Sequence, residues 1–213
     1  MKKQRFFMLG IITVLVAVLS LTFVSSTFAR YTTSGSGEDS ARVAKWGVSV
    51  TVDAEEAFGE KYEDAISATG TKVVSSVSGQ DVLAPGTEGQ LASISIEGTP
   101  EVMVSISATF ELTLTGWQIN SEEYCPLVFT VNATEFKKAA DETVEAFANR
   151  VEAAVIAILK GENIAANTDL ARSVTITWEW AFDGDHAKDT ALGNLATAPT
   201  IAVEYSATVD QVN

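Results

Sequence analysis

The longest periodic pattern in the chain lies between residues 102 and 114, where apolar and polar side chains alternate strictly. A period of two, rich in threonine and β-branched residues, is typical of a strand with one buried face and one wet face. The same alternation predicts strands at 48–52, 91–96, 127–131, 174–182 and 201–209, with a further short strand at 73–77. We therefore expect a mainly β fold, an antiparallel jelly-roll-like sandwich whose sheets each bury one face.

The period changes to that of a helix between about residues 141 and 160. Phe147, Val151 and Val155 fall on one face, and charged side chains fill the other. Asp141 lies where a helix N-terminus favours negative charge, and Gly161 follows as a stop. An amphipathic helix can pack on its own sheet or lie on a membrane, but an acidic polar face favours packing. One helix is therefore expected between the strands of the sandwich.

The first 29 residues form a targeting segment. Three basic residues precede an apolar run from residue 8 to 24, and small residues (Thr27 and Ala29) stand at the positions that a signal peptidase reads. About 20 apolar residues can also span a bilayer, so an uncleaved anchor is the alternative. The polar, Gly/Ser-rich stretch that follows favours cleavage between Ala29 and Arg30. We expect a signal peptide at 1–29, a flexible arm at 30–42 and a single domain at 43–213, secreted and without a stable membrane anchor after cleavage.

Charge and cysteine content narrow the range of partners. A formal net charge of −14 disfavours nucleic acid and anionic lipid as partners, because their phosphates repel it. Cys125 is the one cysteine of the chain, so it cannot form an intrachain disulfide. A small buried thiol is the simple interpretation, and an intermolecular bridge is the alternative.

The residues offer little catalytic chemistry. His186 is the one histidine, so a histidine-based zinc site cannot be built, and no nucleophile elbow, phosphate loop or dinucleotide fingerprint occurs. We expect neither an enzyme nor a cofactor. Asp183, Asp185 and Asp189 could offer oxygens to a weakly bound calcium ion, although their spacing departs from an EF-hand and a hairpin loop of turn formers explains them more simply.

Several segments together resemble the TasA/camelysin family of exported Gram-positive proteins. They are Thr-Phe-Ala-Arg-Tyr-Thr-Thr at 27–33, Lys-Trp-Gly-Val at 45–48, Leu-Ala-Pro-Gly-Thr-Glu-Gly at 83–89, Trp-Glu-Trp-Ala-Phe at 178–182 and the turn at 189–193. The resemblance covers about 30–58, 82–131 and 174–213, and it rests on the order of the segments.

This resemblance implies a jelly roll secreted through a dedicated signal peptidase, which builds extracellular biofilm-matrix fibres by self-association or with related subunits. Each subunit of such a fibre adds its N-terminal arm as a strand to its neighbour, and the donor here would be Arg30, Tyr31, Thr32 and Thr33 within an arm that ends near residue 39.

Two other functions remain open. Camelysin relatives have been described as metallopeptidases, for which this sequence shows no zinc-ligand set. The other alternative is a monomeric cell-surface module that binds glycan or protein, with exposed Trp46 or Trp117 as its platform.

Overall fold

The computed structural model describes residues 41–53, 57–58, 62–63, 72–73, 75–77 and 80–212. The chain divides into two compact units, Met1–Arg42 and Val43–Asn213. All but two residues of the first unit lie outside the described residues, so the elements below all belong to the second unit. None of the helices in the described part of the chain is long and apolar enough to cross a membrane.

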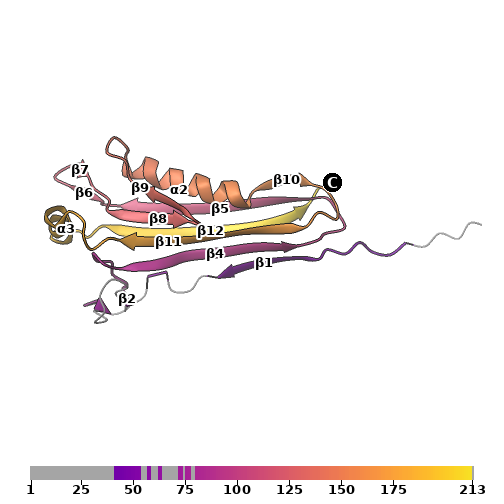
Figure 1. Ribbon diagram of the computed structural model, residues 1–213, viewed down its shortest axis with the longest axis horizontal. Coiled ribbons are helices and arrows are strands. Elements are labelled where there is room, and N and C mark those ends of the chain that lie inside the picture. The colour runs from indigo at the N-terminus through magenta and orange to yellow at the C-terminus, as the bar shows by residue number, and fades with distance from the viewer. Residues whose placement is uncertain are drawn as a thin grey trace, which may run out of the picture. The chain divides into compact units, whose positions relative to one another are not determined.

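One layer of the second unit is a five-stranded antiparallel sheet (Figure 1). Its strands lie in the order β1 (Val48–Asp53), β4 (Glu88–Gly98), β11 (Leu170–Trp180), β8 (Leu127–Val131) and β9 (Thr134–Lys137). A bulge between β4 and β11 changes the register at Ile176, which allows Leu91 and Ala92 both to be buried although they are consecutive. The mainly β, antiparallel fold expected from the alternation is confirmed.

The second layer combines a smaller sheet with a helix. The sheet has the order β10 (Gly161–Ile164), β5 (Val104–Thr115) and β12 (Thr200–Gln211), again antiparallel. Two short hairpins complete the described strands, β2 (Tyr62–Glu63) with β3 (Lys72–Val73) and β6 (Gln118–Ile119) with β7 (Glu122–Glu123). The main core lies between the two layers and includes Ile94, Phe110, Phe129, Val174 and Trp178.

Helix α2 (Val144–Leu159) confirms the change of period in the sequence. It packs against β5, β11 and β8, and the rings of Phe147 and Phe129 lie 5.6 Å apart. Thr143 caps its N-terminus by accepting a hydrogen bond from the Ala146 amide, so the helix begins slightly later than the sequence suggested. Between β9 and β10 in the chain, the helix is an insertion that covers part of the larger sheet (Figure 1).

Two predictions of local structure were wrong. The stretch at 73–77 is not a strand, because β3 ends at Val73 and the described residues 75–77 have no strand structure, with a bend at 76–77. The hairpin loop expected around Asp183–Asp189 contains a second helix, α3 (His186–Gly193). Asp185 caps α3 by accepting a hydrogen bond from the Lys188 amide at 3.1 Å, which uses one of the turn-forming side chains to start a helix.

Candidate functional site: an open seam between two edge strands

β12 forms one edge of the smaller sheet, and its apolar face is poorly covered. Within the described chain β12 pairs with β5 alone. In that pairing Val203 stands opposite Leu112 and Tyr205 stands opposite Phe110. Paired residues of antiparallel strands share a face, yet Leu112 and Phe110 are each 3% exposed whereas their β12 partners are only half-buried. The inward face of β12 is therefore accessible along its length, through Ile201, Val203, Tyr205, Ala207 and Val209.

β1 shows the same property at the edge of the larger sheet. Val50 pairs with Ile96 and Val52 pairs with Ile94, so these valines point toward the interior like their partners. Both isoleucines are fully buried, but Val50 is 39% exposed and Val52 is 42% exposed. Apolar side chains of an interior face are thus left in contact with water.

β1 and β12 approach each other along the same side of the sandwich, but no ladder joins them in the described residues. Each strand consequently presents a row of backbone N–H and C=O groups on the side away from its one partner. We call this region the seam and define it by the inward residues of β1 (48, 50 and 52) and of β12 (201, 203, 205, 207 and 209). It combines free hydrogen-bonding edges with an apolar floor, which is the chemistry that an added strand needs.

The other sheet edges are protected. The side of β5 away from β12 is covered by β10 at one end and by α2 beyond it, where Glu152 accepts a hydrogen bond from the Leu112 amide at 2.7 Å. β9 ends the larger sheet with four residues, among them a lysine, and Lys138 follows directly. Short strands and lysines are common ways of blunting an edge. β12 is long, with twelve residues, and has no lysine, arginine or proline; its charged residues, Glu204 and Asp210, lie on the outer face. β12 is therefore the less protected edge.

No protein-family model matches the chain, and neither does any curated protein. The function is therefore inferred from the geometry of the described residues.

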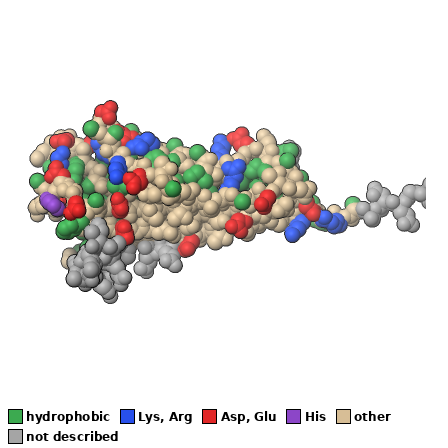
Figure 2. All heavy atoms as spheres, in the orientation of Figure 1, with side chains coloured by type: hydrophobic (Ala, Val, Ile, Leu, Met, Phe, Trp, Pro, Cys, Tyr) green, Lys and Arg blue, Asp and Glu red, His purple; other side chains and the backbone are tan. Residues whose placement is uncertain are grey.

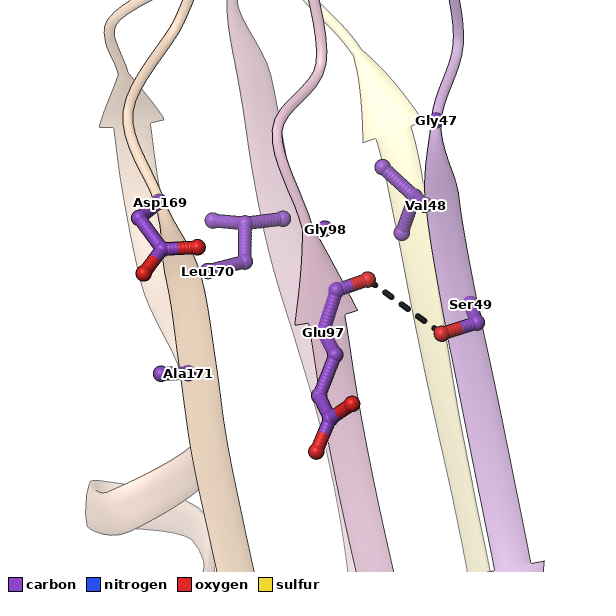
Figure 3. Close-up of a pocket in the computed structure, with 8 residues that line it drawn as sticks. All are labelled: Gly47, Val48, Ser49, Glu97, Gly98, Asp169, Leu170 and Ala171. Atoms are coloured by element: carbon purple, nitrogen blue, oxygen red, sulfur yellow. Dashed lines mark hydrogen bonds between the residues drawn. The ribbon is translucent and has the colours of Figure 1, made fainter.

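A shallow pocket of about 600 Å³ lies on the outer surface where β1, β4 and β11 meet (Figure 3). Its lining includes the carboxylates of Glu97 and Asp169, and Ser49 donates a hydrogen bond to the Glu97 carbonyl. Two carboxylates on an open surface do not make a metal site, and the described part of the chain contains no group of three or more histidine, cysteine or acidic side chains that could hold a metal ion.

The predicted calcium ligands are used in other ways. Asp185 caps α3 and Asp183 is exposed. Asp189 is 6% exposed and lies against the core, where it accepts hydrogen bonds from the Tyr124 hydroxyl at 2.7 Å and from the Trp180 indole N–H at 3.3 Å. The three carboxylates do not form a group that could hold a metal ion, so the structure adds no support for weak calcium binding, which stays a prediction. Burial and the hydrogen bond to Asp189 raise the pKa of Tyr124 above its usual value.

Other residues singled out in the sequence are placed as follows. Trp46 is 41% exposed, but Trp117 is 3% exposed and donates its indole N–H to the Thr200 carbonyl at 2.9 Å, so Trp117 cannot serve as an exposed binding platform. His186 begins α3, with its ring 6.1 Å from that of Phe182. Cys125 is buried, and burial raises the pKa of its thiol to about 12, as expected for an inert structural thiol.

The predicted cleavage position at Ala29 and Arg30 and the predicted donor residues Arg30, Tyr31, Thr32 and Thr33 lie outside the described residues. The seam itself was not predicted. The alternation at 48–52 and 201–209 indicated half-buried strands, but nothing in it distinguishes a covered inward face from an uncovered one.

Proposed function

We propose that the protein is a secreted structural subunit of an extracellular, biofilm-matrix type of fibre, and that it polymerises when the N-terminal arm of one subunit adds a strand to the seam of the next. The single observation that carries this proposal is the seam, in which β12 with twelve residues and β1 with six each have one partner strand in the described residues and leave an apolar interior face exposed. A monomer that exposes such an edge is expected to aggregate unless something covers it.

Strand addition suits the seam for two reasons. Backbone groups of β12 and β1 supply hydrogen bonds that do not depend on the sequence of the incoming strand. The apolar floor can bury every second side chain of that strand. In addition, a contact between the arm of one copy and the seam of another is head-to-tail, so it does not close on itself and generates a filament. The resemblance to TasA/camelysin proteins and the jelly-roll interpretation of the sandwich agree with this mechanism.

The exported form is part of the proposal, because the arm becomes a free end only after cleavage. N-terminal sequencing of the protein from the culture medium should begin at Arg30. A product that begins downstream of the Gly/Ser-rich stretch would have lost its donor and would contradict the mechanism.

The acceptor can be tested by placing a charge in the seam. Val203→Lys puts an ammonium group on the apolar floor, and Thr208→Lys puts the same group on the exposed outer face of β12 as the matched control. In the processed chain, Val203→Lys should abolish filaments seen by negative-stain electron microscopy, while Thr208→Lys should keep them. Equal filament formation by the two variants, with both folded by circular dichroism, would show that the seam accepts no strand.

The donor can be supplied separately. Protein that lacks residues 30–39 should be a monomer, and a synthetic peptide with the sequence of residues 30–41 should bind it and protect β12 amides from hydrogen exchange. A scrambled peptide of the same composition is the control. Protection of β12 by both peptides, or by neither, would refute a specific donor role for the arm.

A further inference from the structure

A second hollow lies at the end of the sandwich where α3 packs. It has a volume of about 580 Å³, and its walls come from segments far apart in the sequence: Phe58, Leu83, Trp117, Trp180, Gly193 and Ile201. Ile201 also belongs to the seam, so the hollow opens at the point where β12 begins. We call it the end pocket.

The end pocket is built for an apolar, flat group. The indoles of Trp117 and Trp180 stand 5.8 Å apart at an angle of 60°. Both indole N–H groups already donate hydrogen bonds to the protein itself, to the Thr200 carbonyl and to Asp189. The two rings are only 3% and 6% exposed, so they close the back of the end pocket and offer it no donor.

The surface open to an occupant comes from the partly exposed Phe58, Leu83 and Ile201. Gln80, Asp81 and Thr200 are the polar side chains of a lining that is otherwise mainly apolar. An indole, which is apolar with one polar N–H, fits a lining of this composition.

The opposite end of the sandwich carries a matching group. β1 begins at Val48, which pairs with Gly98 at the far end of β4, whereas the end pocket lies beyond the other end of that sheet, where Gly86 contacts Trp180 (Figure 1). Directly before β1, Trp46 is 41% exposed and Val43 is 91% exposed. Tryptophan is enriched at protein interfaces, so Trp46 is the side chain at this end best suited to contact a partner.

We propose that the end pocket receives Trp46 of a second copy of this chain, so that subunits meet end to end at a tryptophan contact in addition to the added strand. This inference rests on the proposed function, which sets the direction of stacking. The twelve residues from Arg30 to Ala41 equal β12 in number. If they lie along β12 of a neighbour, Trp46 follows five residues later, within about 17 Å of the strand's first residue. That residue, Thr200, lines the end pocket.

Charge agrees with this direction. Lys45 directly precedes Trp46, and the Lys45 amide donates a hydrogen bond to the Glu101 carboxylate. Asp81 lines the end pocket and is exposed. Figure 2 shows acidic side chains beside the histidine at the end that carries α3, and basic side chains together with acidic ones at the end where β1 begins. The junction would bring Lys45 of one copy toward Asp81 of the next, one pair of opposite charges that favours this direction of stacking.

Photocrosslinking tests the contact directly. A benzoylphenylalanine in place of Trp46, in a mixture of isotope-labelled and unlabelled processed chains, should crosslink between copies. The crosslinked peptides should contain residues 80–83 or 192–201. Crosslinks confined to one copy, or mapped to other regions of the partner, would overturn the proposal. Benzoylphenylalanine is itself apolar and aromatic, so it should still fit the pocket.

Substitutions on the two sides of the contact test its contribution. Trp46→Ala removes the inserted group, and Gly193→Phe fills the pocket from a position where an added Cβ has no atom within 4 Å. Ala198→Phe, at a second exposed position of the lining, fills it independently. We expect each to raise the critical concentration for assembly on the order of 10- to 100-fold, the effect of losing burial of an exposed indole. Met103→Ala is the control, because Met103 is 43% exposed and adjoins β5 at the same end as Trp46.

Mixing the variants gives a sharper result. A Trp46→Ala chain keeps a usable pocket, and a Gly193→Phe chain keeps a usable tryptophan. At concentrations where neither variant assembles alone, the equimolar mixture should form heterodimers and no filaments. In each heterodimer, Trp46 of the Gly193→Phe chain enters the pocket of the Trp46→Ala chain. The heterodimer then has no intact tryptophan and no open pocket with which to add a further subunit. Unchanged assembly of Trp46→Ala and of both pocket-filling variants would refute the contact.

The outcomes separate this inference from the proposed function. If strand donation is right and the tryptophan contact is wrong, deleting residues 30–39 abolishes filaments while the Trp46 and Gly193 variants behave as the parent protein does. If strand donation is wrong and the contact is right, protein that lacks residues 30–39 still gives the expected crosslinks and assembles as the parent protein does. Binding of a saccharide or an indole-sized molecule in the pocket, with no crosslink between copies, would assign the pocket to a small ligand and overturn the proposal.

Discussion

Gly98 is the position where a single methyl group should disrupt the wall of the seam. It ends β4, pairs with Val48 of β1 and has a φ of +138°. A Cβ built on Gly98 would lie 2.0 Å from the Gly47 carbonyl oxygen and 2.9 Å from the Val48 Cα. Both neighbours are backbone atoms, so no rotamer change can make room; Figure 3 shows where Gly47, Val48 and Gly98 lie. In Gly98→Ala the chain must either move Gly47 and Val48 away from β4 or change the backbone at residue 98.

The cost has two parts. An L side chain at this φ costs about 1–3 kcal/mol in backbone strain. Separation of the first residues of β1 from β4 adds the loss of ladder hydrogen bonds, at about 1 kcal/mol net for each bond. The two parts are partly alternative, since moving β1 relieves the clash. We therefore expect Gly98→Ala to lower the free energy of unfolding by about 3 kcal/mol and to increase hydrogen exchange in residues 48–53.

Urea unfolding measures the first effect, and hydrogen exchange with mass spectrometry measures the second. Gly193→Ala is the matched control, because an added Cβ there meets nothing within 4 Å and the residue ends a helix. Its free energy of unfolding should stay within about 0.5 kcal/mol of the parent value. If the two variants are equally stable and residues 48–53 remain equally protected, then close backbone packing at Gly98 does not hold β1 to β4. The position of β1 in the seam would then depend on other contacts.

Three further predictions concern polar and ionisable groups. Tyr124→Phe removes one of the two donors to buried Asp189 and should lower the free energy of unfolding by about 1.5–3 kcal/mol in urea titrations. The pKa of Cys125 is raised from 9.0 to about 12 in the fold, so as the pH rises the thiol ionises first in the unfolded chain. The free energy of unfolding should therefore be steady below pH 9 and decline between pH 9 and 12. Cys125→Ala should flatten this decline in melting curves. The pKa of Glu142 is lowered to about 2 by its hydrogen bonds from Arg150 and the Ala139 amide. The contribution of Glu142 to the free energy of unfolding is therefore complete above pH 4.5 and is lost as the pH falls toward 2. Arg150→Met should raise the Glu142 pKa in an NMR titration and cost about 0.5–1 kcal/mol of stability, because the pair is partly solvated.

The sequence predicts the strands better than the loops because a period of two leaves few alternatives. The strand expected at 127–131 matches β8 at both ends, and the strands at 48–52, 174–182 and 201–209 match β1, β11 and β12 within a few residues. α2 was equally clear, since six of its apolar residues are buried along one stripe. In each case a repeating pattern reports burial directly.

α3 was missed because it lacks such a stripe. The helix has eight residues and buries only Asp189 and Leu192. Its segment is dense in aspartate and glycine, which favour turns. The one local sign of a helix was Asp185 as an N-cap, with an acidic residue in the first turn. The role of Asp189 was missed for a different reason, because its partners Tyr124 and Trp180 are brought to it by the fold and not by sequence spacing. The burial of Trp117 against Trp180 depends on the same kind of long-range contact.

The seam shows why alternation alone cannot identify a binding surface. β5 and β12 have the same length and the same alternation, and they pair along all twelve residues, yet the inward face of β5 is largely buried and that of β12 is not. The difference lies in what stands on the far side of each strand. β5 has β10 and α2 beyond it, whereas in the described residues β12 has no strand beyond it, and β1 across the gap is itself an edge. The apolar and polar residues of β12 alternate as strictly as those of the covered β5. This alternation indicates that the inward face of β12 is also covered when the protein functions. Since no described part of the same chain covers it, the missing cover is most simply another strand, and its source decides whether the protein is a monomer or a polymer.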